Sequence, residues 1–67
     1  MSVAKVSEIS AASAKSFDDA VKIGIERANK TLKHISGAWV SEMKVDVENG
    51  KVSQYRVNMK VTFVLAD

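Results

Sequence analysis

The clearest pattern in the chain is a strict alternation of apolar and polar residues near its C-terminal end. The apolar positions are Tyr55, Val57, Met59, Val61, Phe63 and Leu65, and the polar ones between them are Arg56, Asn58, Lys60 and Thr62. Successive side chains of a strand point to opposite faces. The alternation therefore predicts a strand over Val52–Leu65 with one face buried.

A second alternating segment, Ala38–Glu48, changes phase along its length. Its apolar residues stand at even positions in Ala38 and Val40 but at odd positions in Met43, Val45 and Val47. A bulge near Ser41–Glu42 would bring both sets onto one face. Asn49-Gly50 then predicts a tight hairpin turn between the two strands.

This hairpin places Val45 opposite Tyr55, Met43 opposite Val57 and Val40 opposite Met59. The only tryptophan, Trp39, falls between Ala38 and Val40. It should therefore point to the outer face beside Lys60, with Asn58 and Arg56 further along.

The middle of the chain shows helical periodicity. Phe17, Ala20, Val21, Gly24, Ile25, Ala28, Leu32 and Ile35 fall on one stripe, opposite Lys22, Glu26, Asn29, Lys30 and Lys33. Ser16 is a good N-cap, and Asp18 and Asp19 stand in the first turn, as in a variant capping box. We predict a helix from Ser16 to about His34, stopped by Ser36-Gly37.

The first residues have a weaker pattern. Val3–Ile9 reads as a short strand, and Ser10–Lys15 as a polar loop. The predicted fold is α+β, in the order β-α-β-β, with a three-stranded antiparallel sheet wrapped around one helix. Residues 1–67 form one domain, and the other sheet face carries Trp39, Arg56, Asn58, Lys60 and Thr62.

Composition narrows the function. The 67 residues include no cysteine and one histidine, so disulfides are excluded and a multi-histidine metal site within one chain is not expected. A domain this small is marginal alone, which favours oligomerisation. The net charge of +2 gives no reason to expect nucleic acid or membrane binding, and no catalytic constellation appears. Nothing in the N-terminal residues indicates secretion, so we expect a cytoplasmic location.

Several exposed positions have two readings. Trp39 is a stacking platform for a flat ligand or a subunit contact. Arg56 is a ligand group or the partner of an ion pair with Asp46 or Glu42. The carboxylates Glu42, Asp46 and Glu48 form a divalent-cation site with symmetry mates or are solvated charges, and Ile23, opposite the helix stripe, is a candidate contact.

Several strings together resemble the dodecins, small flavoproteins of bacteria and archaea. They are Lys5-Val6-Ser7-Glu8-Ile9, Ser16-Phe17-Asp18-Asp19-Ala20-Val21, Ala28-Asn29-Lys30-Thr31-Leu32-Lys33-His34-Ile35, Val47-Glu48-Asn49-Gly50-Lys51-Val52 and Tyr55-Arg56-Val57-Asn58-Met59-Lys60-Val61-Thr62-Phe63. The resemblance implies a hollow homododecamer. Its flavin-binding members hold pairs of flavins between tryptophans and are regarded as storing and quenching flavin, not as enzymes.

The resemblance also assigns positions. Aligned without gaps, the family's stacking tryptophan falls on Gly37, and the glutamine that binds the flavin ring falls on Arg56. Trp39 is displaced by ~6.6 Å along the strand. The candidate flavin site is therefore Trp39, Arg56, Gly37 and Asn58, with riboflavin or FMN as the ligand. Another branch of the family has an arginine after the tyrosine and is linked to calcium, so a flavin-free shell that binds calcium or is purely structural is the alternative.

Overall fold

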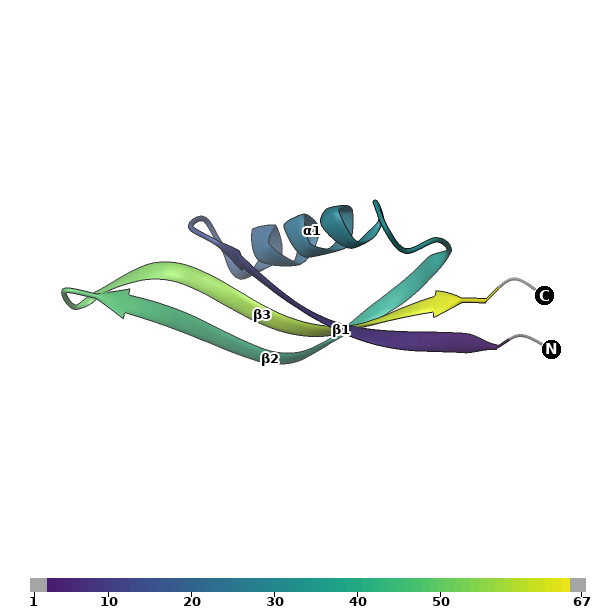
Figure 1. Ribbon diagram of the computed structural model, residues 1–67. Coiled ribbons are helices and arrows are strands. Elements are labelled where there is room, and N and C mark those ends of the chain that lie inside the picture. The colour runs from purple at the N-terminus through teal and green to yellow at the C-terminus, as the bar shows by residue number, and fades with distance from the viewer. Residues whose placement is uncertain (1–2, 66–67) are drawn as a thin grey trace.

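The chain folds as three antiparallel strands and one helix. The computed structural model describes residues 3–65, in the order β1 (Ala4–Ser13), α1 (Phe17–Ala28), β2 (Ile35–Glu48) and β3 (Lys51–Val64) (Figure 1). The strand order in the sheet is β1-β3-β2, so β3 pairs with both of the others. The predicted β-α-β-β fold class is confirmed.

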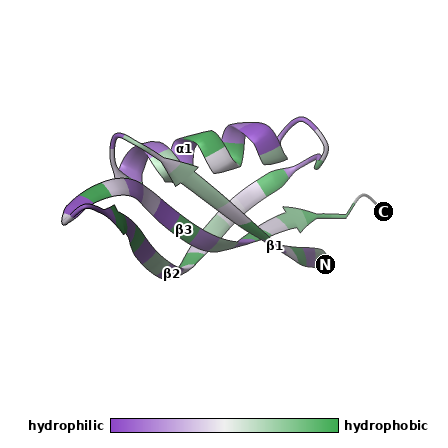
Figure 2. Cartoon of the chain, turned by 60° about the vertical axis from the view of Figure 1, so that its left-hand side comes forward, coloured by the Kyte–Doolittle hydropathy of each residue, from purple (hydrophilic) through white to green (hydrophobic). Residues whose placement is uncertain are grey.

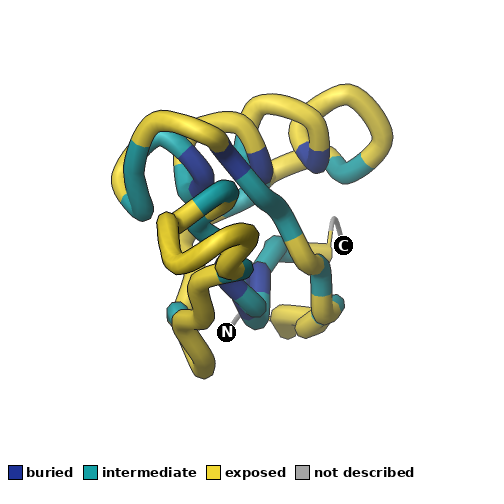
Figure 3. Tube along the Cα trace, turned by 90° about the vertical axis from the view of Figure 1, so that its left-hand side faces the viewer, coloured by how far each residue is buried: buried dark blue, intermediate teal, exposed yellow. Residues whose placement is uncertain are grey.

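The core lies between α1 and the odd-numbered face of β3. Val57, Met59 and Val61 are fully buried on β3, and Ala20 of α1 is buried against Val57 and Met59. The helix contacts β1 and β3, and the buried positions gather between helix and sheet (Figure 3). Apolar and polar bands alternate along β2 and β3 (Figure 2), as a sheet covered on one face requires.

The helix begins as predicted but ends earlier. Ser16 Oγ accepts a hydrogen bond from the Asp19 backbone N–H at 3.0 Å, so Ser16 is the N-cap. The Asp19 carboxylate accepts instead from Ser13 Oγ at 2.6 Å, which ties the end of β1 to the first turn. This serine–aspartate bond joins the two elements at the point where the chain reverses.

Two sequence predictions at the end of the helix are wrong. The helix does not reach His34, because the chain leaves α1 after Ala28 and His34 adopts a positive φ of 62°. Ser36-Gly37 is not a stop but part of β2. The Leu32 N–H still donates to Ala28 O at 2.8 Å, which closes the last turn. Ile35, predicted on the helix stripe, pairs with Phe63 instead, because joining the sheet gives its backbone a partner.

β1 is longer than predicted. Residues 10–13, the first part of the predicted loop, pair with Tyr55–Asn58 of β3. Their small side chains have little strand propensity, but Ala11 packs on the core. Tertiary pairing therefore overrides the local signal. The other strands also differ at their ends from the predicted bounds: β2 begins at Ile35, and β3 spans Lys51–Val64.

The β2–β3 ladder contains three register shifts, one of them at the predicted bulge. They leave Ser36 and Ser41 of β2 and Ser53 of β3 without a partner residue, so each extra residue is a serine. Ser41 Oγ donates to Asn58 O and Ser53 Oγ donates to Asp46 O, both at 3.1 Å. These hydroxyls bind backbone carbonyls where the ladder is interrupted. The pairs Val45–Tyr55, Met43–Val57, Val40–Met59 and Trp39–Lys60 are confirmed.

The hairpin turns at Asn49 and Gly50, as predicted. Their φ values of 53° and 77° fit a turn with positive φ at both central residues. The hairpin extends past the helix (Figure 1), and the structure is elongated at 51 × 19 × 14 Å. Met43, Val45, Val47 and Val52 of the hairpin are exposed.

Candidate functional site

The sheet face turned away from α1 is the candidate site. Because the odd-numbered residues of β3 face the core, its even-numbered residues and their partners on β2 lie on the outer face. From one end to the other, the rows are Gly37–Thr62, Trp39–Lys60, Glu42–Asn58, Lys44–Arg56 and Asp46–Gln54.

Trp39 is the most exposed large apolar side chain on this face. Its relative exposure is 69%, and the Lys60 ammonium lies 5.6 Å from the ring centroid in a cation–π contact. Gly37 precedes it on the same face, and a Cβ built on Gly37 would meet no atom within 4 Å. The indole therefore stands beside open space of the kind a flat ring could occupy.

Arg56 is held by an ion pair. Its guanidinium donates to Asp46 Oδ2 at 3.1 Å and to Gln54 Oε1 at 3.4 Å. The pair is part-exposed, so it contributes at most about 1 kcal/mol to stability. The residue directly opposite Arg56 is Lys44, a like charge that is unfavourable across a ladder. Asp46 offsets that repulsion from the next row.

The carboxylates predicted as possible cation ligands, Glu42, Asp46 and Glu48, do not form a cluster within one chain. Glu42 accepts a hydrogen bond from Asn58 Nδ2 at 2.9 Å, and Asp46 holds Arg56. In the described part of the chain, no three histidine or acidic side chains are close enough to share a metal ion. A site completed by symmetry mates remains a prediction.

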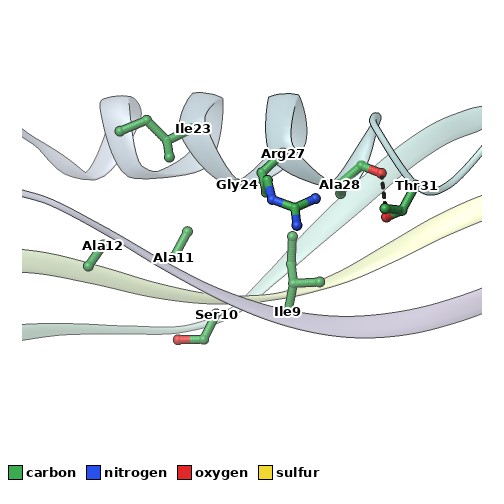
Figure 4. Close-up of a pocket in the computed structure, with 9 residues that line it drawn as sticks. All are labelled: Ile9, Ser10, Ala11, Ala12, Ile23, Gly24, Arg27, Ala28 and Thr31. Carbon is green, nitrogen blue, oxygen red and sulfur yellow. Dashed lines mark hydrogen bonds between the residues drawn. The ribbon is translucent and has the colours of Figure 1, made fainter.

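A groove of about 280 Å³ opens on the other side of the molecule, between α1 and β1 (Figure 4). Ile9, Ala11, Gly24 and Ala28 line it, and Arg27 reaches from α1 toward Ile9. Ile23, the predicted contact, also lines the groove and is 44% exposed. The Thr31 hydroxyl donates to Ala28 O at 3.4 Å, so it is already engaged.

Comparison with known proteins identifies the family. The family model for dodecins matches residues 3–66. This chain belongs to the dodecin family. A dodecin from Streptomyces davaonensis is 30% identical, with a TM-score of 0.94, and the match covers 98% of this chain and 97% of that one. Its coverage shows that the whole β-α-β-β unit is shared.

Two further structures are similar. A variant of the Thermus thermophilus dodecin is 28% identical, with a TM-score of 0.94 and 100% of both chains covered. A calcium dodecin from Mycobacterium tuberculosis, described as calcium-chelating, is 31% identical with a TM-score of 0.82, covering 96% of this chain and 91% of that one. A search of curated protein sequences gave no significant match.

In this dodecin, the four predicted flavin-site residues lie on one face of the sheet but are spread over several rows of it. Gly37 and Trp39 adjoin, Asn58 lies in the next row, and Arg56 lies one row further. Arg56 is four residues from Lys60 along β3, or ~13 Å. Arg56 and Trp39 are therefore too far apart for one side chain to lie directly over the other.

Lys44 was missed as a neighbour of this face, although the bulge at Ser41 fixes which way it points. The contact between Lys60 and the indole was also missed, because Lys60 was placed only beside Trp39. The sequence contained the necessary information in both cases, because the even or odd position of a residue on either side of the bulge assigns it to a face of the sheet. The even or odd position of a residue does not indicate the direction in which a long side chain extends over that face.

Proposed function

We propose that this dodecin binds and sequesters a flavin, riboflavin or FMN, on the outer face of its sheet, with Trp39 as the stacking platform. The observation that carries the proposal is the 69% exposure of Trp39 beside the open Gly37. An indole of that size on an open sheet face is suited to stacking with a planar ring. Loss of emission from the stacked flavin is the expected signature.

The neighbouring residues supply polar contacts. Asn58 has an amide one row from Trp39, and its bond to Glu42 sets its orientation. Arg56 donates from the guanidinium but cannot accept a hydrogen bond, so it cannot act as glutamine does in the family's flavin sites. In this proposal the Arg56 guanidinium is a hydrogen-bond donor near the far edge of the ligand, and Gly37 leaves room for the ring.

Assembly is part of the same proposal. We infer a homododecamer, because the hairpin leaves Met43, Val45, Val47 and Val52 exposed and a chain of this size gains stability when such surfaces are covered.

No helix in residues 3–65 has the length and apolar character to cross a membrane. We propose a cytoplasmic protein that is not an enzyme.

The second candidate is a dodecin shell that does not bind flavin and instead holds calcium or serves as a structural assembly. The similarity to the calcium dodecin favours it, as do Gly37 and Arg56 at the flavin-contact positions. Glu42 and Asp46 supply carboxylates on the outer face, two rows apart. A neighbouring copy would have to complete the ligand set.

Flavin titration separates the two. Riboflavin and FMN are titrated with the purified protein while flavin fluorescence is followed, beside Trp39→Ala, Trp39→Phe and the control Lys51→Ala at the start of β3. We expect quenching at micromolar protein, lost in Trp39→Ala and largely kept in the other two. If the wild type does not quench and calorimetry shows calcium binding, the second function replaces the first. Light scattering must show about twelve subunits, and a monomer would contradict the assembly.

A further inference from the structure

We propose that Lys60 sets the ligand class of the Trp39 platform by selecting a flat aromatic molecule that carries an anionic group. The inference rests on the proposed function, since it concerns what stacks on Trp39. Its basis is the position of the Lys60 ammonium, 5.6 Å from the indole centroid. Among flavins, it predicts a preference for FMN, which carries a phosphate, over uncharged riboflavin.

Lys60 has two neighbours across the sheet with which its side chain can interact. Glu8 of β1 is directly opposite Lys60 in the sheet, and Trp39 is directly opposite on β2. Within residues 3–65, no carboxylate oxygen lies within 4.0 Å of the Lys60 ammonium, and the side chain leans on the indole instead. In the described part of the chain Lys60 therefore makes no ion pair, and its ammonium lies at the platform.

The other charged groups of the face are differently placed. Arg56 is neutralised by Asp46, and Glu42 is bonded to Asn58. Lys44 lies two rows from Trp39, beside Arg56. The charge that lies against the indole ring is the positive charge of Lys60, and an anionic substituent on a stacked ligand would meet it there.

Neutral and anionic ligands experience this lysine differently. An ammonium on the indole face occupies π surface that a stacking ring also uses, so a neutral ligand must displace it. A cation–π contact at an exposed site corresponds to about two- to fivefold in binding. An anionic ligand meets the same cost but gains an ammonium–phosphate contact, roughly tenfold at a part-exposed site.

The test compares the binding of two flavins in proteins with and without the charge of Lys60. Riboflavin and FMN are titrated against the wild type, Lys60→Gln and Lys51→Gln, where Lys51 begins β3 far from Trp39 and matches the loss of net charge. We expect the wild type to prefer FMN roughly tenfold. In Lys60→Gln the preference should fall to about one, with riboflavin bound two- to fivefold more tightly. High salt should weaken the wild-type preference.

An unchanged preference in Lys60→Gln, or a wild type that prefers riboflavin, overturns the role of Lys60 while leaving flavin binding intact. A wild type that binds neither flavin overturns the proposed function instead. The charge at Trp39 is then measured without flavin, because Trp39 is the only tryptophan. Its fluorescence should be quenched more by iodide, relative to caesium, in the wild type than in Lys60→Gln. Equal ratios would refute the inference.

Discussion

Gly24 lies where the helix packs closely on the sheet, and substituting it gives a sharp test of the packing. A Cβ built on Gly24 would lie 2.6 Å from Met59 Cε, 3.0 Å from Ala11 Cβ and 3.6 Å from Ile9 Cδ1. Gly24→Ala is favourable for the helix itself, because alanine is about 1 kcal/mol better than glycine in a helix interior. Helix propensity and packing thus predict opposite signs.

Packing should outweigh propensity at this position. The Met59 methyl is the end of a flexible side chain and can shift, whereas the Ala11 Cβ is fixed to the backbone of β1 and cannot move without moving the strand. Overpacking of this kind costs about 1–3 kcal/mol. Subtracting the helix gain leaves a net destabilisation of about 1 kcal/mol for Gly24→Ala.

Urea unfolding followed by circular dichroism measures this at a fixed protomer concentration, because assembly adds to apparent stability. The matched experiment repeats Gly24→Ala in an Ala11→Gly background, which removes the rigid neighbour. We expect the substitution to become neutral or stabilising there, so the two sites should couple by about 1 kcal/mol or more. A Gly24→Ala protein about 1 kcal/mol more stable than wild type would refute the close approach.

Three further substitutions test the hairpin by urea unfolding. Ser53→Ala should lower the free energy of unfolding by about 1 kcal/mol, because the hydroxyl donates to Asp46 O in a part-buried bulge. Gly50→Ala should cost about 1 kcal/mol, since φ is 77° there and alanine is strained in that region. Asp46→Asn should cost at most about 1 kcal/mol, an effect that shrinks in 1 M salt, because its partner Arg56 is part-exposed.

Each of these substitutions has its own control. Ser10→Ala, on an exposed part of β1, should have little effect beside Ser53→Ala, and equal losses would remove the special role of the bulge serine. Asn49→Gly should be tolerated, because glycine adopts positive φ freely, and a large loss would contradict the turn geometry. A salt-independent loss in Asp46→Asn would show that the carboxylate does more than pair with Arg56.

The sequence predicted the hairpin best. The alternation after Val52 and the change of phase at Ser41 both have period two, so they fix which side chains share a face and, with Asn49-Gly50, which residues pair. The same reasoning placed Trp39 beside Lys60. These properties depend on neighbours along the chain or directly across one turn.

The errors occur where a distant contact decides the outcome. Leu32 and Ile35 continue the helical period, yet Ile35 pairs with Phe63, which no local pattern indicates. Residues 10–13 are too small to signal a strand, and they extend β1 because β3 is present to pair with them. Pairing across the sheet thus overrides propensity in both segments.

The site was predicted in part for the same reason. The alternation of side chains along the strands places Gly37, Trp39, Asn58 and Arg56 on one face. The direction of each side chain depends on which of several possible partners it contacts, and the sequence does not indicate which one. Arg56 reaches Asp46 rather than Glu42, although the sequence is compatible with either partner. The selection is made by geometry across the bulge, which shifts Glu42 opposite Asn58.

The serine bulges have a consequence for how copies of the chain can meet. β2 is an edge strand of 14 residues, and a long, regular edge would offer its free N–H and C=O groups to the edge of another molecule. Ser36 and Ser41 interrupt that row, and their extra residues twist the strand locally. Open-ended stacking of sheets through the β2 edge is thereby discouraged.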